Sequence, residues 1–579
     1  MLKKTLIFVL FILSGCAHKE RNFNLCPEIA IHSPDKIEFS DTEKRLVCGD
    51  PEEEAYKNIP AYQAKFSMKG FLQSKGYSKP DIVQNGDSLD IHTGEQTRLN
   101  SVEVNSDIFV DSEKLQKNMY RHHRKEVLTP KLLDALEKEA TRFMRDRGYP
   151  CVKVKSKVNV DEGILTMDVT NLKSFPYGEI PRESIEGVDD RALERFYPFK
   201  PEFPFTQRGL DLTEKRFTRA GIVQGTFFQE KCELDKNSFS MTQEFIVGPP
   251  RTIRFGAGAS TELGPIARAK WSNQRFGPMA STMEASVQAS LKTQTLKLST
   301  DQYWWPDHPR QSVLGELALE RNDQKDFLEK SASLKPHMQW SSDTLNRNWI
   351  WSSGPTFTIG SFNSKALDET RKYKTIALEG SLQTQTHVYE IFDDHPQDGD
   401  YTRFNFDLRH PALGFMDPLF KLDYTFLKLI YIGHLGKGSA IGGFRINSGT
   451  TIVRNHVDPS TLPPSVKYYG GGSDDVRGFE LATLPSNAGA GSLTKFSVKL
   501  EARKTHMFDP NLEGFTFVDT AWFGRESMKL QKQLWYSPGG GVRWFSPIGI
   551  VQSYLARALS NQTPKDDGFF FFVGIGGVF

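Results

Sequence analysis

Arg477 and Asp519 are the two residues whose types and surroundings predict a specific interaction. Arg477 lies between Val476 and Gly478 in the segment 468–479, in which three consecutive glycines allow backbone angles that other residues rarely adopt. Such a segment can fold back and present one cation, although it is also typical of a solvent-exposed loop. Asp519 lies in the otherwise apolar run 514–522 and shares strand parity with Phe517. A charge there needs a partner, and a bidentate bond from Arg477 would hold the loop against that strand.

Other groupings of polar residues do not predict catalysis. The chain has no Gly-x-Ser-x-Gly, Gly-x-x-x-x-Gly-Lys-Ser/Thr or His-Glu-x-x-His motif and no Cys-x-x-Cys spacing. His122-His123 lies in the basic stretch 121–125, which favours a solvated face over a metal site. Asp474-Asp475 is more typical of a polar turn than of a calcium site. We therefore expect no enzymatic activity, no metal and no cofactor.

Composition favours a membrane β-barrel over other classes. The net charge of +2 gives no argument for nucleic-acid binding. Hydrophobic residues make up 38% and aromatic residues 12%, with 42 Phe, and no apolar run is long enough for a membrane helix. Low apolar content with many aromatics suits a barrel, in which every second strand residue meets lipid. A large soluble β-sandwich is the alternative.

The first residues predict export. Lys3 and Lys4 precede the short apolar block 6–13, which is typical of a secretory signal peptide over residues 1–15. The residues Leu-Ser-Gly-Cys16 resemble a bacterial lipoprotein cleavage box, so we expect Cys16 to be lipidated, with an ordinary cleavage site as the alternative. Residues 16–27 are then a linker.

Four further cysteines lie in the N-terminal half: Cys26, Cys48, Cys151 and Cys232. An exported chain meets an oxidising compartment, where disulfides form. Four cysteines allow three connectivities, and Cys26 with Cys48 is the local choice.

Residues 28–250 contain a sequence that occurs three times. Segment 71–77 (FLQSKGY) is similar to segment 143–149 (FMRDRGY) and, more weakly, to segment 217–222 (FTRAGI). Each copy follows a helical pattern, ends it at a glycine and continues into two short alternating strands. We expect tandem α+β domains at 28–97, 98–175 and 176–250, with three unrelated α+β domains as the alternative.

From residue 251 to 579 the pattern changes to strict alternation. Segments 283–292, 403–409 and 495–503 place apolar residues on one face and polar or charged residues on the other. Because a charge at the bilayer midplane costs about 2–4 kcal/mol, the charged face must meet a hydrated interior. The length of this region predicts a barrel of about 16 antiparallel strands.

The two terminal strands of this barrel are rich in glycine. The final strand, 568–579, contains Gly574, Gly576 and Gly577 and ends on Phe579, and the first strand, at about 252–261, contains Gly256 and Gly258. Glycines reduce side-chain packing, so we expect a weak seam between these strands. The alternative is that the glycines only relieve curvature of the sheet.

Taken in order, these motifs resemble the BamA/TamA superfamily of outer-membrane assembly and translocation proteins. Val476-Arg477-Gly478-Phe479 is similar to the inner-loop motif of that superfamily, and Phe517-Val-Asp519 to its Phe-x-Asp strand motif. Segment 539–549 is similar to the strand and turn that follow, and Phe579 to the terminal insertion signal. The three α+β copies look like POTRA (polypeptide-transport-associated) domains, and three copies in 579 residues are most similar to the TamA branch.

The resemblance implies the location, the partners and the activity. It places the barrel in the lipid bilayer of the bacterial outer membrane and the POTRA domains in the periplasm, bound to a TamB-like partner. Unfolded outer-membrane clients, including autotransporter-like proteins, would be inserted or translocated through the lateral seam. Phospholipid transport with that partner, a dedicated two-partner secretion pore and a passive porin are the alternatives.

Overall fold

The computed structural model describes residues 21–579 except for several short gaps. The gaps are 51, 54–56, 58, 234, 237, 366–368, 392–394, 411–417, 436–437, 455–456, 458, 486–489, 548, 562–567 and 576–579. The chain divides into two compact units, residues 1–174 and 175–579. No helix among the described residues is long and apolar enough to cross a membrane.

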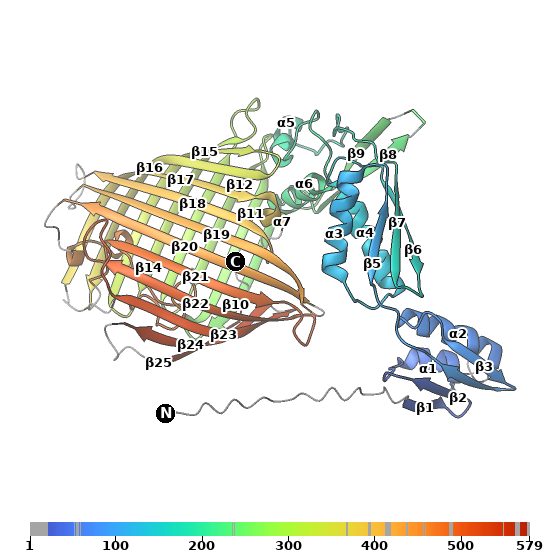
Figure 1. The fold of residues 1–579 in the computed structure, drawn as a ribbon. Coiled ribbons are helices and arrows are strands. Elements are labelled where there is room, and N and C mark those ends of the chain that lie inside the picture. The colour runs from blue at the N-terminus through green and yellow to red at the C-terminus, as the bar shows by residue number, and fades with distance from the viewer. Residues whose placement is uncertain are drawn as a thin grey trace, which may run out of the picture. The chain divides into compact units, whose positions relative to one another are not determined.

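The first α+β copy is a four-stranded sheet with two helices (Figure 1). Its elements are β1 (Arg21–Cys26), β2 (Ile29–Ser33), α1 (Asp41–Cys48), α2 (Ala61–Ser74), β3 (Asp81–Asn85) and β4 (Ser88–His92). The strand order is β1-β2-β4-β3, with β2 parallel to β4. Cys26 and Cys48 form a disulfide. Residues 21–26, which the sequence placed in a linker, pair with β2 instead, because their backbone groups extend an open sheet edge.

The second copy repeats this topology without the added strand. Its elements are β5 (Ser101–Asn105), α3 (Phe109–His123), α4 (Pro130–Arg145), β6 (Lys153–Asn159) and β7 (Ile164–Thr170), in the strand order β5-β7-β6. Thr129 caps α4 by accepting a hydrogen bond from the Leu132 amide. The helix then buries Leu136, Ala140 and Met144, one turn apart, in the core of this copy.

The third copy belongs to the second unit. It contains α5 (Asp190–Leu193), the 3₁₀ turn η2 (Glu194–Phe196), α6 (Gln207–Ala220), β8 (Gly225–Glu233) and β9 (Ser238–Ile246). Arg182 forms a parallel bridge with Gln243 on β9, in the place of the first strand of the other copies. Gly76, Gly148 and Gly221, the glycines predicted to end the three helices, all have positive φ.

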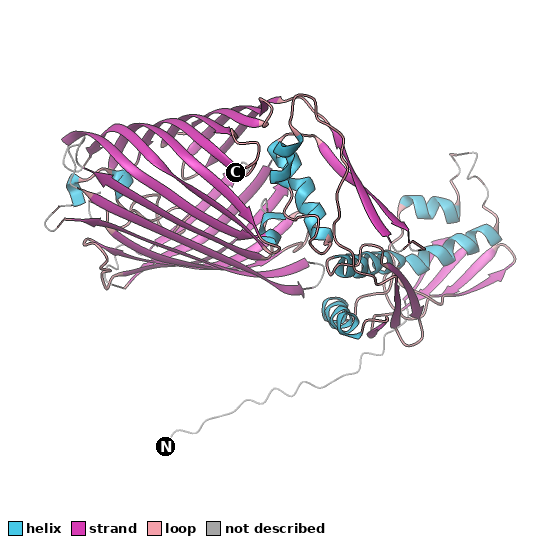
Figure 2. Ribbon diagram, turned by 90° about the horizontal axis from the view of Figure 1, so that it is seen from above, coloured by secondary structure: helices cyan, strands magenta, loops and turns pink. Residues whose placement is uncertain are grey.

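The barrel closes through sixteen antiparallel strands. Figure 2 shows the barrel from the side, with its tilted strands as magenta ribbons. The strands on its first half are β10 (Arg251–Ser260), β11 (Gly264–Phe276), β12 (Ser281–Ala289), β13 (Thr293–Gln302), β14 (Gln311–Asp323), β15 (Phe327–Asp343), β16 (Arg347–Ser364) and β17 (Glu369–Thr386). Those on its second half are β18 (Gly399–His410), β19 (Leu419–Leu435), β20 (Gly438–Val453), β21 (Thr494–Lys504), β22 (Leu512–Gly524), β23 (Leu534–Ser546), β24 (Gly549–Ser560) and β25 (Gly568–Ile575). The short helix α7 (His387–Ile391) lies between β17 and β18, and the turns η4 (Pro459–Thr461) and η5 (Pro464–Val466) follow β20.

The predicted fold class is therefore confirmed: α+β POTRA-like segments precede a closed barrel of sixteen strands. The alternation of side chains is the physical cause, since it gives each strand one apolar and one polar face. The signal peptide with Cys16, the two glycines Gly576 and Gly577, and Phe579 lie outside the described residues. Apart from the linker, which is wrong at residues 21–26, the domain boundaries stay predictions.

Candidate functional site

The segment between β20 and β21 enters the barrel lumen and brings Arg477 to Asp519 on β22. Arg477 donates from Nε to Asp519 Oδ2 at 2.7 Å and from Nη2 to Oδ1 at 2.8 Å, and its backbone amide donates to Oδ2 at 3.1 Å. The Arg477 side chain is 3% exposed and that of Asp519 is 0% exposed. The structure thus contains the bidentate pair that the two sequence motifs suggested.

Apolar contacts hold the same loop in place. The Arg477 guanidinium lies 3.4 Å from the ring centroid of Phe517, close enough for a cation–π interaction. Val476 and Phe479, on either side of the arginine, are buried in a cluster with Phe523 and Trp535. Burial of each such side chain contributes about 1.5–3 kcal/mol, so the loop is held by packing as well as by charge.

Gly478 lies where the loop passes closest to the barrel wall. A Cβ at this position would lie 2.4 Å from the Ser537 hydroxyl and 3.0 Å from the Ala558 amide nitrogen. Gly471 and Gly472 have φ values of +98° and +92°, which place them in the region that favours glycine. The glycines of this segment therefore serve close approach and an unusual chain path.

The loop also contacts the hairpin at the other side of the seam. Glu262 lies in the turn between β10 and β11, and its Oε2 accepts a hydrogen bond from the Ser473 amide at 3.1 Å. Asp475 accepts a hydrogen bond from the Gly471 amide and forms an ion pair with Lys495 at 2.9 Å. One loop thus joins the first hairpin of the barrel to strands near its end.

A network of lumenal charges continues from Arg477 across the barrel. Arg477 Nη1 donates to Glu501 at 2.6 Å, and Glu501 also accepts from Arg543 at 3.0 Å. Arg543 donates to Glu513 at 2.8 Å, and the His395 Nε2 lies 2.9 Å from the second oxygen of Glu513. The sequence motifs did not identify Glu501, Arg543, Glu513 or His395. The alternation in segment 495–503 nevertheless assigns Glu501 to the lumenal face.

A cavity of about 480 Å³ lies beside this network, and both seam strands line it. Gly256 and Gly258 of β10 and Gly574 of β25 are among its lining residues, together with Arg477 and Glu501. The lumen-facing glycines leave room there because they have no side chains. A lining of charged groups and backbone suits hydrated contents.

The seam itself pairs at two positions among the described residues. These are Ala259 with Ile575 and Ser260 with Gly574, whereas β10 pairs with β11 along its whole length. The outward residues of the two strands include Phe255 and Phe569, which are strongly exposed, as expected of a lipid-facing wall. The predicted weakness of the seam is not measured by these contacts and stays a hypothesis.

A second charged centre joins the third copy to the barrel. Arg216 of α6 donates to Asp343 at the end of β15 and to Glu390 of α7, at distances of 3.0–3.1 Å. Burial lowers the pKa of Arg216, but the two carboxylates outweigh burial and raise it above the ordinary value. This domain is therefore attached to the barrel by buried ion pairs.

Two histidine groups lie outside the barrel. The ligand atoms of His32, Asp90 and His92 on the first sheet lie within 4.8 Å of one another, a spacing that sequence reasoning did not detect because the residues come from two strands. His123, in contrast, lies between Glu126 and Glu139, at 3.2 Å and 2.9 Å. This second group is an ion-pair cluster on the basic stretch that was predicted to be solvated.

Comparisons with known proteins show what this chain is similar to. A family model described as "Omp85 superfamily domain" matches residues 280–579. A solved structure of BamA from Haemophilus ducreyi lacking POTRA domains 1–3 is similar at 15% identity, covering 83% of this chain and 99% of that chain, with a TM-score of 0.50. CdiB from Acinetobacter baumannii matches at 13% identity, 83% and 90% coverage and a TM-score of 0.46. CdiB from Escherichia coli matches at 11% identity, 94% and 100% coverage and a TM-score of 0.48.

Proposed function

The chain belongs to the Omp85 superfamily, and from this premise we propose that it assembles or translocates client proteins by lateral opening of the seam between β10 and β25. The superfamily comprises outer-membrane assembly and translocation barrels. The barrel lies in the bacterial outer membrane and the POTRA domains lie in the periplasm. Unfolded outer-membrane proteins, autotransporter-like chains among them, are the proposed clients.

The observation that carries this proposal is the short pairing of the described seam. Among the described residues, the seam is joined by the pairs Ala259–Ile575 and Ser260–Gly574 and by a hydrogen bond from the Thr261 amide to the Val573 carbonyl, whereas β10 pairs with β11 over its whole length. An opened seam presents unpaired backbone groups in a membrane, where each such group costs several kcal/mol. A client strand that adds to this edge removes that cost and enters the bilayer already paired.

In this proposal, the inner loop stabilises the closed state of the seam between β10 and β25. It bonds to Asp519 on β22, packs against Ala558 on β24 and bonds to Glu262 in the hairpin of β10. Because these contacts lie on both sides of the seam, release of the loop favours opening. The POTRA-like domains would bind partners at their sheet edges, such as β3 and β6.

A disulfide across the seam tests the mechanism. A Cβ built at Gly574 lies 3.5 Å from the Ser260 Cβ, within the separation of about 3.5–4.5 Å that disulfides adopt. We expect the oxidised S260C/G574C protein to lose client insertion in reconstituted vesicles and to regain it on reduction. Full insertion by the fully crosslinked protein excludes lateral opening.

The matched control is a crosslink between strands that stay paired. Ser352 of β16 and Ser381 of β17 lie opposite each other, with their hydroxyl oxygens 2.8 Å apart. Oxidised S352C/S381C should insert clients as well as the unmodified protein does. Loss of insertion in both crosslinked proteins would indicate general rigidification rather than a blocked seam.

Two narrower parts of the proposal concern the subgroup of the superfamily to which this chain belongs and the molecules that it transports. Three POTRA-like copies favour a TamA-type member with a TamB-like periplasmic partner, and lipidation at Cys16 is part of the same proposal. Phospholipid transport with that partner is the second candidate, and a dedicated two-partner secretion pore is the third. Depletion of the protein followed by outer-membrane proteomics and lipid analysis separates them, since each predicts loss of a different cargo.

A further inference from the structure

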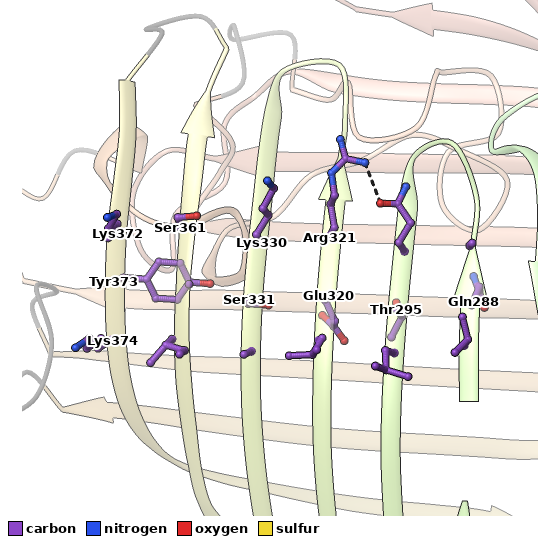
Figure 3. Close-up of a pocket in the computed structure, with 18 residues that line it drawn as sticks. Gln288, Thr295, Glu320, Arg321, Lys330, Ser331, Ser361, Lys372, Tyr373 and Lys374 are labelled. Atoms are coloured by element: carbon purple, nitrogen blue, oxygen red, sulfur yellow. Dashed lines mark hydrogen bonds between the residues drawn. The ribbon is translucent and has the colours of Figure 1, made fainter. Parts of the chain in front are cut away.

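The outer wall of the barrel carries a groove that the proposed function does not use. It has a volume of about 760 Å³ and crosses β12 to β17 near the ends that lead into the turns at 290–292 and 324–326 (Figure 3). The connection from β10 to β11, like these turns, lies at the barrel end opposite the third POTRA-like copy, because β10 begins where that copy ends. The groove therefore opens on the lipid-facing wall at the extracellular end.

Strand register shows that two rows of outward side chains form the groove. The lower row is mostly apolar and contains Val287, Leu296, Leu319, Ala332, Ile359 and Lys374. The upper row is polar and basic and contains Ala289, Gln294, Arg321, Lys330, Ser361 and Lys372. The groove thus follows the boundary between the apolar band of the wall and the extracellular interface.

The cations in these rows differ from those of the lumen. In the part of the chain that the structure describes, Lys330, Lys372 and Lys374 form no ion pair, and all three are exposed. Lumen-facing lysines on neighbouring strands are paired: Lys297 lies beside Glu316, and Lys335 lies 3.2 Å from Glu379.

Arg321 lies directly opposite Lys330 and bonds to Gln294 at 2.8 Å and to Asp323 at 2.7 Å. Two acidic residues of β14 lie near these cations. Glu320 lines the groove but has the lumenal strand parity, and Asp323 at the rim also accepts from Lys365 at 2.7 Å. Since Asp323 is shared between two cations, the three wall lysines leave a net positive patch. Paired strands lie about 4.8 Å apart, so Lys330 and Lys372, two strands apart, are separated by about 10 Å.

We propose that this groove binds a lipid whose phosphate-bearing headgroup carries a net negative charge, in the extracellular leaflet of the outer membrane. The phosphates would lie between Lys330, Lys372 and Lys374, whose ammonium groups donate to phosphate oxygens. The acyl chains would follow the apolar row that contains Leu319 and Ile359. A lipid is the occupant that fits, because a lipid-facing wall is reached from the plane of the bilayer and this boundary combines apolar surface with unpaired positive charge.

Native mass spectrometry of the full-length protein in detergent tests the proposal, with diphosphorylated lipid A as the probe. We expect K330Q/K372Q/K374Q to bind the probe roughly a hundredfold more weakly than the unmodified protein, given the usual contribution of a lysine near anionic lipid. The matched control K65Q/K69Q/K131Q removes three exposed lysines from the periplasmic domains and should bind normally. The variant K330R/K372R/K374R keeps the charge and should also bind.

Three outcomes overturn the proposal. Equal binding by the glutamine variant shows that the lysines do not hold the ligand. Equal binding of phosphatidylcholine, whose phosphate is balanced by the choline cation, shows that the groove does not select a headgroup with net negative charge. Displacement of lipid A by inorganic phosphate at matched concentration shows a site for free phosphate rather than for a lipid.

Discussion

Substitution of Asp519 by Asn is the sharpest test of how the inner loop is held. The carboxylate accepts three hydrogen bonds from Arg477, two from the guanidinium and one from the backbone amide. Asparagine keeps the shape but removes the charge and one acceptor. Arg477 then keeps Glu501 as its one ion-pair partner among the described residues.

The free-energy cost of D519N follows from the burial of the Arg477 and Asp519 side chains. Breaking a buried ion pair by removing one partner costs about 3–5 kcal/mol, because the other charge stays buried without compensation. The contact from Arg477 to Glu501, at 2.6 Å, keeps part of that compensation, so we take the lower value of about 3 kcal/mol. This free energy changes the ratio of seated to released loop about a hundredfold.

The assay measures the accessibility of a buried loop position. Val476 is 0% exposed, so a cysteine placed there should resist a membrane-impermeant maleimide while the loop is seated. In D519N we expect the labelling rate of V476C to rise about a hundredfold, provided that labelling follows loop release. The control D509N makes the same chemical change at an exposed turn and should leave the rate unchanged.

An unchanged labelling rate in D519N would refute the reasoning, because it would show that apolar packing alone holds the loop. The double variant R477M/D519N separates the two contributions. If the uncompensated charge of Arg477 is the main cost of the D519N substitution, removing both charges should restore part of the protection of V476C from labelling. The reason is that replacement of a buried ion pair by apolar groups is often tolerated. Faster labelling than in D519N would contradict this account.

Two further predictions concern the periplasmic domains. The variant R216M leaves Glu390 buried without its cation, so we expect a loss of about 3–5 kcal/mol in the attachment of α6 to the barrel, measured by faster proteolysis between them. Burial lowers the pKa of His123, but Glu139 and Glu126 outweigh it and raise the pKa above its ordinary 6.5. Protonated His123 therefore stabilises the folded second copy through its two carboxylate partners. This stabilisation is complete below pH 6.5 and is lost as the pH rises through the raised pKa, so the melting temperature of the second copy should fall as the pH rises from 6.5 through that pKa. H123Q should remove this dependence, and an unchanged dependence would assign it to another group.

Local pattern accounts for much of this fold. The period-two alternation of segments such as 283–292 and 495–503 predicts a barrel, because a strand between lipid and water has no other stable arrangement of its faces. The glycines after the repeated helical segments predicted the helix ends, since positive φ is tolerated best by glycine. The linker was assigned wrongly at 21–26, because edge pairing depends on an open neighbouring strand and not on the residues themselves.

The sequence by itself determined the order of the domains, the strand character of residues 251–579 and the identity of Arg477 and Asp519 as partners, because each depends on local spacing or on the cost of an unpaired charge. Only the tertiary structure decided what surrounds them. Glu262, Glu513 and His395 come from distant segments, and strand register is what brings them to the lumenal loop. The wall groove has the same cause: its lysines form one patch because β15 and β17 are aligned through β16, and a sequence read along one strand does not contain that alignment.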